Sequence, residues 1–206
     1  FIFNHFLPMC GAIWSVSFDK VLKMPIKTIL YFFSNHGLLS FFNKPKWRTI
    51  KGGSKNYVIE ILKRINGNIY VNEKVNSVTR NKNQIIIKSK NFNKIYDKVV
   101  FAVHSDDILK LITNPSSDEV NTFSYCKYED NKIYVHQDKK LMPNNNKVWS
   151  SWNVISNIQK DDQKLFNKNI CVTYWINKLQ NFTSNEPLLV TLNPDSNNLP
   201  KKEKIL

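Results

Sequence analysis

The apolar residues near the start of the chain recur with the spacing of an α-helix. Residues 17–42 carry a wide apolar surface with three lysines on one face, which predicts helical structure. Pro25 should kink this segment or begin a new helix, and Gly37 should end it by adopting a positive φ. The apolar residues 1–18 lack the basic start of a signal peptide, so we expect them to be buried.

In the central part of the chain, the apolar residues follow the spacing of a helix in some segments and of a strand in others. Gly52 and Gly53 predict a turn, which leads into a helix that Ser54 can cap. Residues 99–103 are an uninterrupted apolar run, typical of a buried parallel strand, and Ser105 can cap the helix after it. Together these elements predict an α/β unit. Its helices cover residues 55–65 and 106–111, and its strands cover residues 69–71, 75–80 and 85–89, a segment through Ile95, and 99–103.

From Asn114 onwards the pattern changes to short strands separated by polar linkers. A short helix should begin at Pro115 to Ser117. The strands after it predict a mainly antiparallel sheet and a second structural unit. They cover residues 125–128, 132–136, 148–154, 170–176 and 188–192.

The charge of the chain is strongly positive, but its pattern does not favour a specific nucleic-acid binder. Lysine and arginine number 30 against 16 acidic residues, a net charge of +14. Nucleic-acid readers rely on clustered arginines, whereas this chain has three arginines and spreads its lysines along its length. A basic amphipathic helix such as residues 17–42 can lie on a membrane surface. Packing of that helix inside the protein, with its lysines in water, is the alternative that its broad apolar face favours.

The positions of the cysteines and histidines argue against a zinc-binding protein, and the hydropathy of the chain argues against a transmembrane helix. Three well-separated cysteines and four scattered histidines provide no zinc-binding spacing. They suit buried thiols in a reducing compartment, so we expect a cytoplasmic protein. No apolar run approaches the roughly 18 residues of a transmembrane helix. The chain begins at Phe1 and stops without a closing element, which we interpret as an internal piece of a longer protein.

Three groups of residues are candidates for a functional site. His104 follows the predicted parallel strand, where open α/β sheets bind ligands, although a lone histidine there is more often structural. The neighbouring Ser105 and Asp106 cannot converge with it as a hydrolase triad. Gly52 and Gly53 let backbone approach an anion, or form a simple turn. The aromatic residues of the later strands either line a pocket or pack in the core: Trp149, Trp152, Tyr174 and Trp175.

The order of these segments resembles the flavin-containing amine oxidase and phytoene desaturase superfamily. The shared features are a Gly-Gly turn with a helix, a strand that carries a valine, a hairpin, and an acidic residue before a V-V-x-A run. More specifically, the chain is similar to bacterial predicted NAD/FAD-binding amine-oxidase-like proteins. Seven segments in order carry this resemblance: PMCGAIWS, FFSNHGLLSF, KPKWRTIKGGSKNYV, FAVHSDD, HQDKKLMPNNNKVWSSWN, VTYWINKLQ and VTLNP.

The resemblance implies a fold and a cofactor. It implies an α/β protein with an α+β substrate unit, in which residues 51–113 are the middle of an FAD-binding domain. Residues 1–50 are then the helical part, and residues 114–206 the antiparallel-sheet part, of a substrate-binding domain. In the superfamily the backbone of the residue matching Val75 contacts the adenine of FAD. The G-x-G-x-x-G fingerprint and the C-terminal flavin-binding segment of the superfamily are missing here.

We therefore expect a portion of an FAD-dependent oxidoreductase that passes a hydride from substrate to flavin. The cofactor-binding candidates are Val75, Gly52, Gly53 and Arg48, and the substrate-binding candidates are His104, Trp149, Trp152 and Tyr174. The apolar residues 17–42 suit a hydrophobic or lipid-like substrate. No general base, metal site or catalytic residue is assigned. The alternative is a non-catalytic remnant or binding protein that kept the fold without the flavin.

Overall fold

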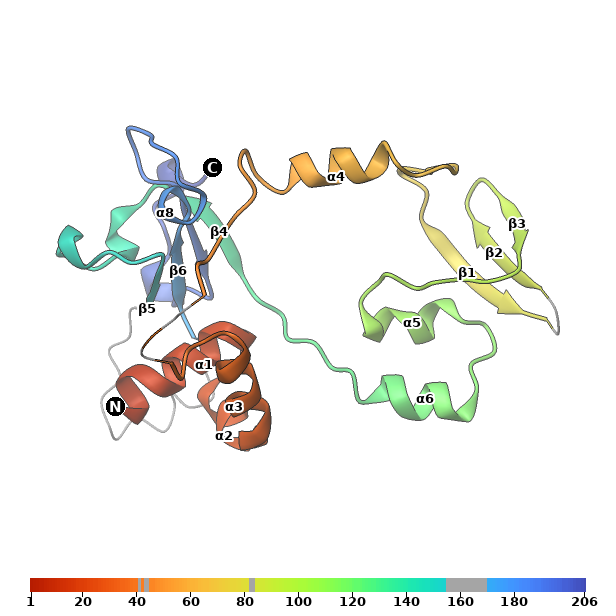
Figure 1. The fold of residues 1–206 in the computed structure, drawn as a ribbon, viewed down its shortest axis with the longest axis horizontal. Helices are drawn as coiled ribbons and strands as arrows, with labels where there is room; N and C mark the ends of the chain where they lie inside the picture. Colours follow the sequence, from red (N-terminus) through yellow and green to blue (C-terminus); the bar gives the residue numbers. More distant parts are fainter. Residues whose placement is uncertain (41, 43–44, 82–83, 155–169) are drawn as a thin grey trace. The chain divides into compact units, whose positions relative to one another are not determined.

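The computed structural model describes residues 1–206 except 41, 43–44, 82–83 and 155–169. Helices accompany one three-stranded and one four-stranded sheet, both antiparallel throughout. The chain divides into two compact units, one formed by residues 1–64 with 130–206 and the other by residues 65–129 (Figure 1). The predicted mixture of helices and sheets is confirmed, and the fold class of the described residues is α+β.

The first unit begins with three short helices that follow a π-helical turn. Pro25 lies directly before the third helix and separates it from the second, as the sequence predicts. The ranges are Ile2–Phe6 for the π-helical turn, Leu7–Trp14 for α1, Phe18–Lys23 for α2 and Ile26–Asn35 for α3.

Gly37 ends α3 in the predicted way. Its φ is +64°, a conformation that costs glycine little and other residues more. Its backbone N–H donates to the carbonyl of Ser34 at 3.1 Å, and the N–H of Leu38 donates to the carbonyl of Phe33 at 2.8 Å. These two bonds form a Schellman motif, which satisfies carbonyl groups in the last turn of the helix.

The core of the first unit joins the N-terminal helices to the start of one strand. Ile170 approaches Gly11 so closely that a Cβ built on this glycine would lie 1.7 Å from the Ile170 side chain. Within residues 1–18, the expected burial is confirmed for Leu7, Cys10, Ala12 and Phe18, residues 13–16 are half-buried, and residues 1–5 are exposed, Phe1 to 85%. The buried apolar residues of this cluster are Leu7, Cys10, Ala12, Phe18, Val21, Ile29, Phe33, Ile170 and Val172.

The sheet of the first unit has the strand order β4-β7-β6-β5. The predicted strands at 132–136, 170–176 and 188–192 are confirmed with slightly shorter limits. The predicted strand at 148–154 is confirmed only from Trp152, because residues 146–148 form a 3-10 turn. The strands are β4 (Ile133–His136), β5 (Trp152–Val154), β6 (Val172–Trp175) and β7 (Leu189–Leu192), with α8 (Ile176–Gln180) after β6. Further 3-10 turns cover Lys139–Leu141, Ser196–Asn198 and Lys202–Lys204.

The second unit contains a three-stranded meander and two helices. The predicted hairpin and the strand through Ile95 are confirmed, although residues 82–83 of the hairpin turn lie outside the described residues. Ser116 caps α6 through a capping box with Glu119, as the Pro-Ser-Ser signal predicts. The elements are β1 (Val75–Arg80), β2 (Ile85–Ser89), β3 (Asn93–Tyr96), α5 (Ser105–Leu111) and α6 (Ser117–Ser124).

Three predicted strands are wrong, because an apolar run becomes a strand only where another strand pairs with it. Residues 69–71, 99–103 and 125–128 belong to no strand of the described chain. The expected parallel strand is instead an extended segment in which Val100 is 90% exposed. Ser105 is also not the helix cap, since it is the first residue of α5 and His104 precedes it.

Candidate functional site

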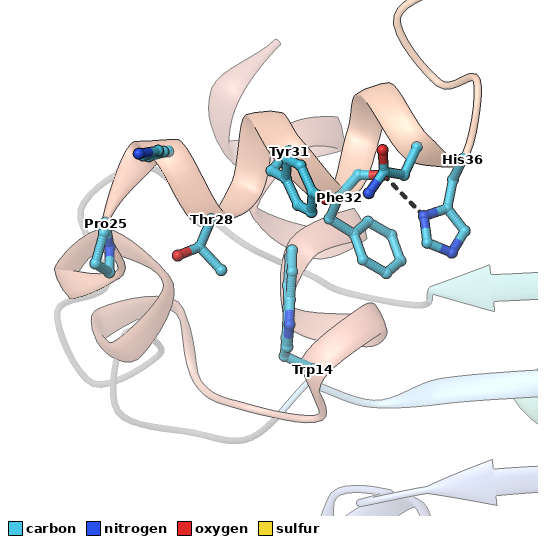
Figure 2. Close-up of a pocket in the computed structure, with 8 residues that line it drawn as sticks. Trp14, Pro25, Thr28, Tyr31, Phe32 and His36 are labelled. Carbon is cyan, nitrogen blue, oxygen red and sulfur yellow. Dashed lines mark hydrogen bonds between the residues drawn. The ribbon is translucent and has the colours of Figure 1, made fainter.

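A cavity of about 590 Å³ lies on one flank of α3. Its walls are mostly aromatic and apolar, with a few polar groups, which is the usual composition of a small-molecule site. Figure 2 shows Trp14, the last residue of α1, standing against the flank of α3 that carries Tyr31 and Phe32. We call this cavity the α3 groove. Its lining residues are Trp14, Pro25, Lys27, Thr28, Tyr31, Phe32, Asn35 and His36.

Aromatic rings in contact form one wall of the α3 groove and continue beyond it. The ring centroids of Trp14 and Phe32 are 5.1 Å apart, and those of Phe32 and His36 are 3.8 Å apart. On its other side, His36 stacks on Trp47 with a centroid distance of 6.0 Å. The imidazole therefore lies between two aromatic rings from different segments.

One hydrogen bond of His36 shows which ring nitrogen carries the proton when the imidazole is neutral. Its Nδ1 lies 2.8 Å from the carbonyl oxygen of Phe32, marked by the dashed line in Figure 2. A carbonyl can only accept, so Nδ1–H donates, and Nε2 is left as an acceptor when the ring is neutral. The eight lining residues also include one lysine, Lys27, and no carboxylate. The groove thus combines aromatic surface with hydrogen-bonding groups and no fixed negative charge.

The Gly52–Gly53 turn requires glycine at both positions. The two φ values are +78° and +89°, in the left-handed region that favours glycine. A Cβ on Gly52 would lie 2.6 Å from the Nδ2 atom of Asn56, which itself donates to the carbonyl of Lys51 at 2.7 Å. A Cβ built on Gly53 would have no described atom within 4 Å, so there is free space beside its Cα. The Gly53 N–H itself donates to the carbonyl of Ile50 at 2.9 Å, so it is already used within the turn.

The turn leads into α4 (Lys55–Leu62), which begins after Ser54 and ends before the predicted Ile65. Ser54 is the N-cap residue, but its side chain makes no capping hydrogen bond. Arg48 lies in the extended segment before the turn, and its side chain is exposed. Arg48 therefore supplies one cation close in sequence to the start of α4, which suits an anion.

Val75 belongs to the second unit, where it is the first residue of β1. Strand β1 is an outer strand of its sheet, and the pairing register shifts between Val75 and Ser77. The segment before it is held by Glu73, whose carboxylate accepts from the Ser89 hydroxyl and from the Asn91 side chain. These hydrogen bonds lower the pKa of Glu73.

His104 is exposed and lies against Tyr128, with ring centroids 4.3 Å apart and ring planes 10° apart. Its Nδ1 is 3.9 Å from a carboxylate oxygen of Asp106, and the Tyr128 hydroxyl is 3.1 Å from the Ser105 hydroxyl. His104 does not follow a buried parallel strand as expected, because no such strand occurs among the described residues. Its assignment to a substrate site stays a prediction.

Four aromatic residues in and beside the sheet of the first unit form two edge-to-face pairs. Trp152 and Tyr174 are directly opposite on β5 and β6, with ring centroids 5.3 Å apart. Trp149 and Trp175 are 5.4 Å apart, and Trp149 Nε1 donates to the carbonyl of Pro143 at 2.7 Å. Tyr174 packs against the N-terminal core, and its burial raises its pKa. None of the four lines the α3 groove.

A buried polar chain crosses the sheet of the first unit. The backbone N–H of Asp138 donates to Nδ1 of His136 at 3.0 Å, so Nε2–H donates to the Thr191 hydroxyl at 2.7 Å. The Thr191 hydroxyl in turn lies 2.7 Å from that of Thr173. All of these side chains are buried, and burial lowers the pKa of His136. This row of hydrogen bonds keeps His136 neutral and links three strands, which is a structural role.

The residues of the α3 groove were not singled out by the sequence. The helix of residues 17–42 was predicted, but Trp14 lies on α1, and only the packing of α1 against α3 brings it beside Phe32. The one available signal was the four-residue spacing of Phe32 and His36, which places both rings on one helix face.

The described residues contain neither a metal-binding cluster nor a membrane-spanning helix. Across the part of the chain that the structure describes, no group of three or more His, Cys, Asp or Glu side chains is arranged to hold a metal ion. Within the same residues, no helix has both the length and the apolar character needed to cross a membrane.

Comparisons with known proteins give a limited result. No protein-family model matches the chain, and no curated protein matches it. Among solved structures, a CLA-producing fatty acid isomerase from P. acnes is similar over 73% of this chain, with 13% sequence identity and a TM-score of 0.48. The match spans 33% of that structure's chain. At this TM-score the likeness supports no argument about function.

Proposed function

We propose that this chain is a portion of an FAD-dependent oxidoreductase of the amine-oxidase-like type. The observation that carries the proposal is the Gly52–Gly53 turn, with both residues at positive φ, leading into a helix in the order that the superfamily resemblance requires. Bound FAD would supply the hydride acceptor, and the chain's own residues would bind and orient the reactants.

The turn and the outer strand β1 fit the cofactor in different ways. No described atom lies within 4 Å of the place where a Cβ on Gly53 would be, so an anionic group would approach the turn from this side, with Arg48 nearby in sequence. Val75 lies on an outer strand, where backbone groups are not all used by a neighbouring strand. The resemblance assigns this position to the adenine, and the proposal adopts that assignment.

The α3 groove would contact the substrate. It lies within residues 1–50, the segment that the resemblance assigns to the substrate-binding domain. Trp14 and Phe32 would exclude water from an apolar substrate, and Nε2 of His36 would accept a hydrogen bond from it. An apolar or lipid-like substrate suits these walls better than a cationic one, because no lining residue is a carboxylate.

The test is to purify the product of the complete reading frame that encodes residues 1–206. We expect an upstream G-x-G-x-x-G segment, visible flavin absorption, and stoichiometric FAD released on denaturation. The 206-residue chain alone should bind FAD negligibly, because it lacks the glycine-rich loop that holds the pyrophosphate. A colourless complete product that takes up no added FAD would contradict the proposal and favour the non-catalytic alternative.

A further inference from the structure

Helix α3 has apolar side chains on two faces, of which only one is buried. Ile29 and Phe33 lie in the core of the first unit. Ile26 and Leu30 are four residues apart, and they remain 61% and 48% exposed. Tyr31 beside them is 70% exposed. A helix that is apolar on both faces is normally covered on both, so the exposed face, Ile26, Lys27, Leu30 and Tyr31, indicates a partner.

The charge around this exposed face identifies the kind of partner. Residues 1–64 contain ten lysines and arginines but only two acidic residues, Asp19 and Glu60, so this segment carries +8 of the net +14. Lys27 of α3 is exposed beside the apolar side chains, and α3 itself has no carboxylate. Lys23, the last residue of α2, is also exposed and forms an ion pair with Asp19 at 2.7 Å. Such a combination of apolar and basic groups complements a surface that is apolar below and negatively charged above.

Exposed aromatic residues of the same segment point to the same partner. Phe1, Phe42 and Trp47 are among its most exposed large side chains. Aromatic side chains are favoured at the boundary between the headgroups and the acyl chains of a bilayer. A protein partner would need acidic groups to balance the lysines, and a nucleic acid would leave Ile26 and Leu30 exposed to water.

We infer that the exposed face of α3 binds the surface of an anionic phospholipid bilayer. Ile26 and Leu30 enter the boundary of the acyl region, while Lys23 and Lys27 contact phosphate and other anionic groups of the lipids. The helix lies in the plane of the membrane surface and does not cross the bilayer. This inference does not depend on the flavin, so it stands or fails independently of the proposed function.

Vesicle co-sedimentation of the 206-residue chain tests the inference. The chain should bind vesicles of equimolar phosphatidylcholine and phosphatidylglycerol at least tenfold more tightly than vesicles of phosphatidylcholine alone. Ile26→Gln with Leu30→Gln should weaken binding by about tenfold or more, since two apolar side chains no longer enter the bilayer. Lys23→Gln with Lys27→Gln should weaken it by about fivefold per lysine. Circular dichroism confirms that each variant is folded.

Matched substitutions in the second unit serve as controls. Ile95→Gln with Val100→Gln removes two apolar side chains that are 59% and 90% exposed, and Lys90→Gln with Lys98→Gln removes two exposed lysines. Both control variants should bind as the unchanged chain does. Equal binding to both kinds of vesicle, an equal loss in the controls, or no binding at all would overturn the inference. Unchanged binding by the Ile26→Gln, Leu30→Gln variant would also overturn it, because binding would then result from nonspecific electrostatic attraction alone.

Discussion

Phe32 and His36 are joined both by their rings and by one carbonyl group. Their ring planes are 18° apart, and the Phe32 carbonyl accepts from the backbone N–H of His36 at 3.0 Å and from its Nδ1–H at 2.8 Å. The last turn of α3 and the wall of the α3 groove are therefore one arrangement. A substitution at His36 should change both.

Replacing His36 by alanine should lower the free energy of unfolding of the first unit by about 1–2 kcal/mol, since one ring stack and one hydrogen bond are lost. All five tryptophans lie in that unit, so urea unfolding followed by tryptophan fluorescence reports on it. The exposed neighbour Ser34, changed to alanine, should alter stability by less than about 0.5 kcal/mol. Equal effects of the two substitutions would show that the ring stack contributes nothing.

Gly37→Ala should destabilise the first unit by at least about 1 kcal/mol, because its φ of +64° is unfavourable for alanine. The new Cβ would also lie 2.4 Å from Cδ of Pro45. Gly37→Asn should cost less if φ dominates, since asparagine adopts the left-handed conformation more readily. The same urea experiment measures both variants. If Gly37→Ala left the free energy of unfolding unchanged, the helix would not end in this conformation.

The stability of the first unit should fall in mildly acidic solution because of His136. Burial lowers its pKa below the ordinary 6.5, so between the two values the unfolded chain binds a proton that the folded chain does not. The stabilising contribution is complete above pH 6.5 and is lost as the pH falls through the folded pKa. The slope reaches at most about 1.4 kcal/mol per pH unit for one proton.

His136→Gln should remove this slope, whatever its effect on stability at neutral pH. The measurement is the free energy of unfolding from urea titrations at a series of pH values below 7. His5→Gln is the matched control, because the His5 side chain is exposed to water in the folded chain too. An unchanged slope in His136→Gln would show that another group is responsible for the acid sensitivity.

In the flavin-binding complete protein, Val75→Ile should leave FAD content almost unchanged, because only backbone groups of this residue are expected to contact the cofactor. Val75→Pro should lower the FAD content of folded protein, since proline removes the N–H donor. Ile95→Pro is the control, on the opposite outer strand of the same sheet. A proline at Val78 of β1 would not serve as this control, because the Val78 side chain is buried and its carbonyl accepts from the backbone N–H of Thr113. Equal FAD content in both proline variants would contradict the assignment at Val75.

Elements whose limits depend on neighbouring residues were predictable from the sequence. Pro25 separates α2 from α3, Gly37 ends α3, and Ser116 with Glu119 begins α6. Each of these signals acts within a few residues, through a fixed φ, a positive φ or a side chain that satisfies a backbone N–H. The hairpin of β1 and β2 belongs to the same class, because its strands are adjacent in the chain.

The elements and sites that depend on distant partners were decided only by the tertiary structure. Residues 99–103 have the composition of a buried strand, yet in the described chain they pair with none, so they remain extended and partly exposed. The burial of His136 required β7 to lie beside β4, which no local pattern specifies. The α3 groove likewise exists because Trp14 of α1 packs against Phe32 of α3. Local backbone preferences are carried by the sequence itself, whereas contacts between distant segments depend on the free energy of packing the whole unit.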